Sequence, residues 1–89
     1  MKKIDLNFAI NDLDGQEIGR ANKLAAMAFI SKRDGDPVKL FDWAMTINKQ
    51  GTLEVDDSDF STIKETIKNS EPLTVLVKGQ ILKYLSTIA

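Results

Sequence analysis

The chain has 89 residues, of which 43% are hydrophobic and 28% are charged, and its 12 basic and 13 acidic residues give a formal net charge of −1. One compact domain (residues 1–89) is expected, because ~100–150 residues is the usual domain size. The sequence contains no cysteine and no histidine, which excludes disulfide bonds, thiolate nucleophiles, Cys/His zinc sites and imidazole acid–base catalysis.

Apolar and polar residues alternate near the start of the chain, where the apolar ones are Ile4, Leu6, Phe8 and Ile10. This period of two predicts a strand with one buried face. Asp14-Gly15 then predicts a turn, because glycine adopts a positive φ without a Cβ clash. A short return strand over residues 16–18 completes a predicted N-terminal β-hairpin with a long first arm.

The period changes after this hairpin. Apolar residues follow the spacing i, i+3, i+4, i+7, i+8 of an amphipathic helix; they are Ala21, Leu24, Ala25, Ala28 and Phe29. The segment Asp34–Pro37 ends this helix and begins the next, because Asp36 is a favourable cap and Pro37 fits a first helical position.

The second predicted helix runs from Pro37 to about Lys49 and is apolar over a broad surface. Its predicted core stripe is Val38, Phe41, Ala44, Met45 and Asn48, with Leu40, Trp43 and Ile47 flanking that stripe. A surface this broad indicates burial on more than one side, or contact with a partner. Trp43 lies roughly 200° around the helix from Phe41, so one of the two is expected to face outward or to cover a second element. Trp43 is either a core residue or an aromatic anchor of an interface.

The rest of the chain predicts one strand and two helices. Thr52–Val55 is expected to form a third strand against the hairpin, because a lone two-stranded ribbon is only marginally stable. Asp57 or Ser58 is expected to cap a third helix, and helical spacing from Leu73 to Leu85 favours a fourth helix over a strand at residues 73–77. The predicted fold is therefore α+β: an N-terminal β-hairpin plus a short third strand packed against about four α-helices.

No pattern in the sequence predicts catalysis, a cofactor or a metal. Ser31-Lys32 are adjacent residues and do not face each other on a helix. The acidic run at Glu54, Asp56, Asp57 and Asp59 lacks the glycine and the closing glutamate of a calcium loop. These carboxylates are interpreted as helix caps or as a charged docking surface, and we expect a protein that is not an enzyme.

Several segments resemble small proteins encoded in phages and prophages: Lys3–Asn7, Asp12–Gly15, Gly35–Pro37, Phe41–Ala44, Leu53–Asp59 and Leu73–Leu82. The resemblance covers most of the chain through dispersed positions and transfers no functional residue. It implies a protein that works by binding, as an assembly factor for the phage head or tail or as an inhibitor of a host system.

The sequence and this resemblance together predict a non-enzymatic protein–protein interaction module that acts in virion assembly and forms a homo-oligomer. Its predicted protein partner is a phage structural or host protein. The candidate contact residues are Leu40, Trp43, Ile47 and Tyr84, with Asp56, Asp57 and Asp59 as an electrostatic rim. The longest apolar run is seven residues, Leu24 to Ile30, so no membrane partner is expected, and a start without the apolar core of a secretory signal predicts a cytoplasmic location.

The alternative is an inhibitor of a host defence system, acting by protein binding or by sequestering a small nucleotide signal. In the second case the basic residues Arg20, Lys23, Lys32 and Arg33 are the candidate phosphate contacts. Nucleic acid is not an expected partner. The only candidate basic patch consists of Lys23, Lys32, Arg33 and Lys39. Asp34, Asp36 and Asp42 lie among these residues and cancel much of the patch's positive potential.

Overall fold

A computed structural model describes residues 1–88 of the chain. In chain order its elements are β1 (Lys2–Asp5), β2 (Ala9–Asn11), β3 (Glu17–Arg20), α1 (Ala21–Ile30), α2 (Pro37–Gln50), β4 (Thr52–Val55), α3 (Asp57–Lys68) and α4 (Val75–Thr87). The predicted α+β class is confirmed, as are the four helices within the described residues. None of the helices in residues 1–88 has the length and hydropathy that crossing a bilayer requires.

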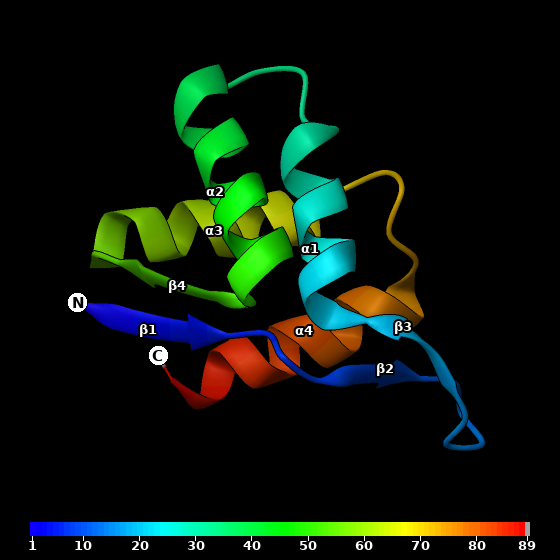
Figure 1. Cartoon of the computed structure of the whole chain (residues 1–89). Coiled ribbons are helices and arrows are strands. Elements are labelled where there is room, and N and C mark those ends of the chain that lie inside the picture. The colour runs from blue at the N-terminus through cyan, green and yellow to red at the C-terminus, as the bar shows by residue number, and fades with distance from the viewer. Residues whose placement is uncertain (89) are drawn as a thin grey trace.

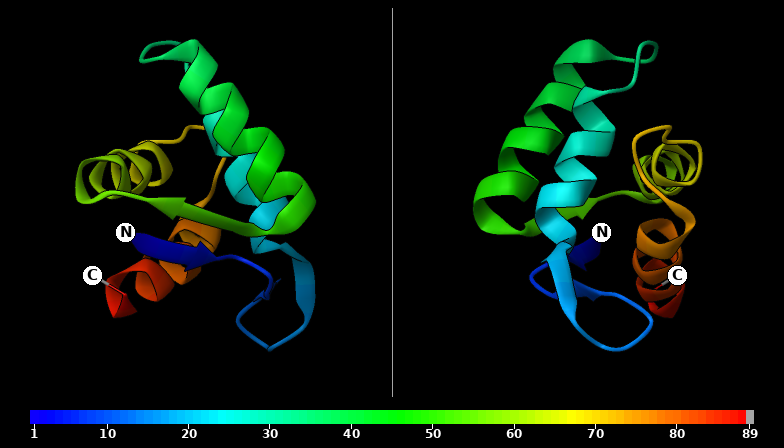
Figure 2. Two further views of the ribbon diagram at one scale, coloured as in Figure 1. Left: turned by 60° about the vertical axis from the view of Figure 1, so that its left-hand side comes forward. Right: turned by 90° about the vertical axis from the view of Figure 1, so that its right-hand side faces the viewer.

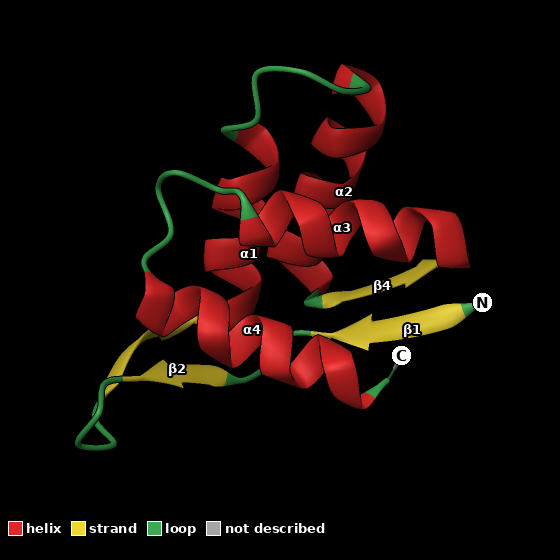
Figure 3. Ribbon diagram, turned by 180° about the vertical axis from the view of Figure 1, so that it is seen from behind, coloured by secondary structure: helices red, strands yellow, loops and turns green. Residues whose placement is uncertain are grey.

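The helices form two antiparallel pairs (Figure 1). α1 and α2 make one layer, and α3 and α4 make the other, with β1 and β4 lying between the two layers (Figure 2). Seen from behind, α3 and α4 run side by side in opposite directions (Figure 3). The outer side of the α1–α2 pair therefore points away from the rest of the molecule.

The strands form two separate two-stranded sheets rather than the expected three-stranded one. β1 pairs antiparallel with β4, with Asp5 opposite Thr52, whereas β2 pairs with β3. The predicted third strand therefore pairs with the first half of the hairpin's long arm, and the return strand pairs with the second half. The chain changes partner at Leu6 and Asn7, where the Leu6 amide donates to the Gly51 carbonyl at 2.7 Å and the Asn7 side chain donates to the Gln50 carbonyl at 3.1 Å.

The predicted turn at Asp14-Gly15 is confirmed. Gly15 has a φ of 88°, a conformation that favours glycine. The Asp12 carboxylate accepts hydrogen bonds at 2.9 Å from the amides of both Asp14 and Gln16. These bonds hold the loop that joins β2 to β3.

The hairpin is also connected to α4 by the side chain of Gln80. Its Oε1 accepts from the Asn11 amide at 3.1 Å and its Nε2 donates to the Asn11 carbonyl at 2.7 Å. The amide group of Gln80 therefore bonds both backbone groups of one β2 residue, as a neighbouring strand would.

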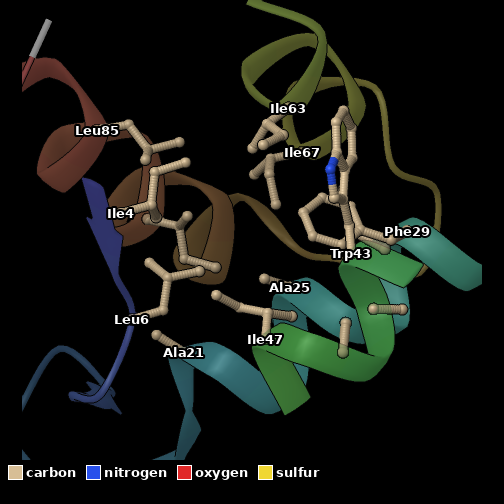
Figure 4. Close-up of a cluster of buried hydrophobic side chains, with 14 of the residues drawn as sticks. Ile4, Leu6, Ala21, Ala25, Phe29, Trp43, Ile47, Ile63, Ile67 and Leu85 are labelled. Carbon is tan, nitrogen blue, oxygen red and sulfur yellow. The ribbon is translucent and has the colours of Figure 1, made fainter. Parts of the chain in front are cut away.

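The structure buries a different side of α2 from the one that the sequence predicts to be buried. The residues that pack into the core are Leu40, Trp43, Ala44 and Ile47, and the predicted stripe of Val38, Phe41 and Met45 is exposed. Both sides of α2 are apolar, so spacing alone does not identify the buried one. The buried side is the one whose Trp43 ring packs against Phe29 of α1, in the same cluster as Ile63 and Ile67 of α3 (Figure 4).

The core joins the two helix layers (Figure 4). The rings of Phe29 on α1 and Trp43 on α2 meet edge to face at 6.0 Å between centroids. In Figure 4 both point toward Ile63 and Ile67 of α3. Ile4, from β1, is 1% exposed and extends the cluster toward α4.

The helix starts are set by side-chain caps. Asp36 accepts hydrogen bonds from the amides of Val38 and Lys39, as the sequence predicts, with Pro37 at the first helical position. For α3 the cap is Asp56, whose carboxylate accepts from the Asp59 amide at 2.7 Å. The prediction of Asp57 or Ser58 as cap was therefore wrong by one or two residues.

Candidate functional site

The structure corrects most of the predicted contact residues. Leu40, Trp43 and Ile47 are 5%, 8% and 1% exposed, so their side chains belong to the core and present no surface to a partner. Tyr84 is half-buried and has a structural role. Its hydroxyl accepts from the Asp5 amide at 2.8 Å and its ring lies 5.3 Å from the ring of Phe8.

The acidic group at the start of α3 serves mainly to hold elements together. Asp56 caps the helix, and Asp57 lies 3.7 Å from the Lys2 ammonium. The Asp59 carboxylate accepts a hydrogen bond at 2.9 Å from Lys39 on α2 and, by this bond and its charge, raises the pKa of Lys39. Its role as the electrostatic rim of a contact surface remains a prediction.

A different apolar surface lies on the outer side of the α1–α2 pair. We call it the α1–α2 face, and its members are Met27 and Ile30 on α1 with Val38, Phe41 and Met45 on α2. They are 42%, 63%, 69%, 58% and 44% exposed, respectively. On each helix they are three or four residues apart, so they form one stripe per helix.

Two contacts place the stripes of the α1–α2 face next to each other. Ile30 and Phe41 line the same shallow depression of 250 Å³ at the end nearest the α1–α2 loop. At the opposite end, the Lys23 ammonium donates to the Asn48 carbonyl at 3.0 Å. The two helices thus present their exposed apolar residues to solvent on one side.

The size of the α1–α2 face is in the range of functional patches. Five large apolar side chains that are about half exposed give a patch of about 500 Å². The largest apolar patch of a typical monomer is ~300–600 Å² and is often functional. Met27 and Met45 suit a contact surface because methionine is flexible and polarizable.

Charged residues differ between the two ends of this face. Lys49 lies near the end of α2, at the same end as Lys23 on α1. Asp42 lies nearer the start of α2, on the same flank as Lys49, because seven residues are almost two helical turns. Both are exposed, and neither belongs to an ion pair with any of residues 1–88.

The sequence does not predict the α1–α2 face as an exposed surface. Val38, Phe41 and Met45 were recognised as a stripe but were assigned to the core. Met27 and Ile30 were not singled out, although they lie three residues apart and outside the alanine stripe of α1. The three-residue spacing of Met27 and Ile30 is the sequence feature that indicates a second apolar stripe on α1.

A polar depression of 920 Å³ lies between the α1–α2 loop and the α3–α4 loop. Its lining residues are Ala28, Ser31, Lys32, Arg33, Asp34, Thr66, Asn69, Ser70, Glu71 and Pro72. Ser70 is 8% exposed, and its hydroxyl oxygen has no hydrogen-bond partner in residues 1–88. A buried hydroxyl without a partner is unfavourable, so this atom is an unmet polar group beneath the lining of the depression.

The charges in the depression nearly balance. Lys32 pairs with Asp34 at 3.0 Å, and this hydrogen bond and the lysine charge lower the pKa of Asp34. Arg33 has no ion pair within the described chain, and Glu71 adds a second negative charge. The carboxyl ends of α1 and α3 also lie here and contribute partial negative charge.

The other predicted phosphate contacts lie apart from this depression. Arg20 precedes the first residue of α1, and Lys23 donates to Asn48, so neither joins Lys32 and Arg33. Within residues 1–88, no three histidine, cysteine, aspartate or glutamate side chains lie together as a metal site requires.

Comparison of the chain with protein-family models, with curated proteins and with solved structures finds no match in any of the three. The resemblance to phage proteins therefore stays a prediction. The function is inferred from the α1–α2 face and from the polar depression.

Proposed function

We propose that the chain is a non-enzymatic protein–protein interaction module whose contact surface is the α1–α2 face. The observation that carries this proposal is the group of five large exposed apolar side chains on the packed helices α1 and α2, of which Ile30 and Phe41 line one depression. Solvent-exposed apolar area is unfavourable, and covering it drives protein association. The absence of histidine and cysteine agrees with a role in binding.

The finer proposal is a role in the assembly of a virion head or tail. It rests on the resemblance to small phage proteins and on the same apolar face, because assembly factors act by covering surfaces of other subunits. An inhibitor of a host system that acts by binding a protein would use this face too. The two roles differ in the identity of the partner.

Site-specific photocrosslinking tests the proposal. A photoreactive phenylalanine analogue replaces Phe41 in the full chain, which is produced in its host during phage growth. The matched control carries the analogue at Ser61, an exposed residue of α3. We expect crosslinks from position 41 that are absent from position 61.

Mass spectrometry of the crosslinked species then assigns the role. Virion components or further copies of the chain support assembly, and a host protein supports inhibition. The absence of crosslinks from position 41, or equal crosslinking from both positions, would contradict the proposed contact surface.

A second candidate function, sequestration of a small phosphate-bearing ligand, is favoured by the polar depression. Ser70 offers an unpaired hydroxyl there and Arg33 an unpaired guanidinium. Because the Asp34 carboxylate already forms an ion pair with Lys32, a phosphate would compete with this carboxylate for the lysine ammonium. Asp34→Asn is therefore expected to strengthen binding of the ligand, and Arg33→Ala to weaken it.

Calorimetric titration with a panel of mono-, di- and cyclic nucleotides tests this candidate. Ligand at 100 times its dissociation constant should also add ~2.7 kcal/mol to the free energy of unfolding. Lys83→Ala, an exposed change on α4, is the control for lost positive charge. If no nucleotide binds, or if Asp34→Asn and Arg33→Ala change affinity in the same direction, sequestration at this site is excluded.

A further inference from the structure

We infer that the α1–α2 face binds a second copy of this chain, with the two α1–α2 pairs packed antiparallel about a two-fold axis. This inference rests on the proposed interaction function and names the partner. Its evidence is the order of charges along α2 together with the area of the face.

The first step concerns symmetry. In a two-fold interface the same patch is used by both copies, so a residue i that contacts j is matched by a j that contacts i. A surface suited to this arrangement carries complementary groups on either side of its own centre. Asp42 and Lys49, which flank the α1–α2 face on α2, form such a pair of complementary groups.

The second step concerns geometry. Asp42 and Lys49 lie on one flank of α2, seven residues and therefore about 10 Å apart along the helix axis. An antiparallel helix reverses this order, so Asp42 of each copy faces Lys49 of the other and two equivalent ion pairs form. A parallel arrangement would instead place like charges opposite each other.

The third step locates the axis. The midpoint between Asp42 and Lys49 falls close to Met45, a flexible apolar residue that is 44% exposed. Phe41 of each copy then packs against the last turn of the partner's α2. In this arrangement Met27 and Ile30 extend the buried area, and the four helices form an antiparallel bundle.

The fourth step concerns strength. Two patches of about 500 Å² bury roughly 1,000 Å² of apolar surface, to which the flanking polar atoms add. This total lies at the low end of specific interfaces, which span ~1,200–2,000 Å². We therefore expect a reversible dimer whose population depends on protein concentration.

Charge reversal and mixing test the inference. Asp42→Lys and Lys49→Asp each place like charges opposite each other twice in the homodimer, so each variant alone should dimerise roughly tenfold more weakly. An equimolar mixture of the two variants forms both ion pairs again, one with its native signs and one with its signs exchanged. Sedimentation equilibrium should therefore show the mixed dimer to be tighter than either variant homodimer.

Lys83→Asp is the matched control for Lys49→Asp, because it makes the same charge change at an exposed position of α4. It should leave dimerisation unchanged, and far-ultraviolet circular dichroism should show all variants folded. A protein that stays monomeric at every soluble concentration would overturn the inference. So would a mixture no tighter than its components, or reversals that leave dimerisation unaffected.

Failure of the dimer and failure of the proposed function are distinguishable. A monomeric protein whose position 41 still crosslinks to a different protein keeps the interaction function and loses the second copy as occupant. A protein that neither dimerises nor crosslinks loses both.

Discussion

Two aromatic residues of α2, only two positions apart, have opposite environments. Trp43 is 8% exposed and packs against Phe29, whereas Phe41 is 58% exposed. The Lys39 ammonium lies over the indole ring of Trp43, 5.6 Å from its centre. Trp43 therefore stabilises the fold, whereas the exposed ring of Phe41 is accessible to a partner.

Alanine substitution at these two positions should separate the roles. Trp43→Ala removes a buried ring and leaves a cavity, so we expect the free energy of unfolding to fall by ~3–5 kcal/mol. Phe41→Ala removes an exposed ring, and the change should stay within about 1 kcal/mol. Urea denaturation of both variants measures the difference. Equal losses would contradict the assignment of Trp43 to the core.

The start of α3 shows how a single carboxylate sets the end of an element. Asp56 satisfies the Asp59 amide at 2.7 Å, whereas the exposed Asp57 makes only a 3.7 Å contact with Lys2. Asp56→Ala should therefore lower the free energy of unfolding by ~1 kcal/mol. Asp57→Ala, the control, should change it by less than ~0.5 kcal/mol. A larger loss at Asp57 would indicate that the helix begins one residue later.

At the scale of elements, the helices were readable from the sequence because their spacing and caps are local. Ala21 to Phe29 keeps one stripe, and Asp36-Pro37 marks the start of α2 by chemistry that needs no distant partner. The strands were less accessible. Alternation from Ile4 to Ile10 predicts extended chain but contains no information on pairing, so the division of that arm between β4 and β3 was not predictable.

The candidate site was harder to predict than the fold for a related reason. α2 carries two apolar stripes, and the one that is buried is the one whose Trp43 packs against Phe29 of α1 beside Ile63 and Ile67 of α3 (Figure 4). That choice is a property of packing between elements and not of α2 itself. The Ser70 hydroxyl had no sequence signal, because its lack of a partner depends on three elements meeting.

The side chain of Gln80 hydrogen-bonds the β2–β3 hairpin to α4. Gln80 bonds both backbone groups of Asn11, and these bonds add to the burial of Ile10 in holding a two-stranded ribbon that would be marginally stable alone. Gln80→Leu keeps the size of the side chain and leaves these two groups unpaired. We expect a loss of ~1–3 kcal/mol and faster amide exchange in residues 9–20.

The control for this change is Gln16→Leu, because the Gln16 side chain is exposed in the hairpin loop and has no hydrogen bond to any of residues 1–88. Its amide exchange pattern should match that of the unmodified chain. Exchange that rises uniformly across the whole protein in Gln80→Leu would indicate a general loss of stability instead of detachment of the hairpin.

At the scale of the molecule, the two-layer arrangement separates a stabilising interior from one apolar outer face. The inner sides of α1 and α2 pack against each other and toward α3, so the fold is complete without the five residues of the α1–α2 face (Figures 2 and 4). Stability and association are therefore expected to respond to different substitutions.

Phe41→Glu tests this separation on the whole molecule. Glutamate is a good helix former, and at an exposed position it should change the unfolding midpoint little. Its charge, placed on the α1–α2 face beside Ile30, would have to be desolvated on association, which is strongly unfavourable for an unpaired carboxylate. We expect the variant to be monomeric by light scattering at concentrations where the unmodified chain associates.

Ser61→Glu on α3 is the control and should associate normally. If Phe41→Glu melts far below the unmodified chain, or if it associates as strongly, the α1–α2 face is not a surface that the fold leaves free for a partner.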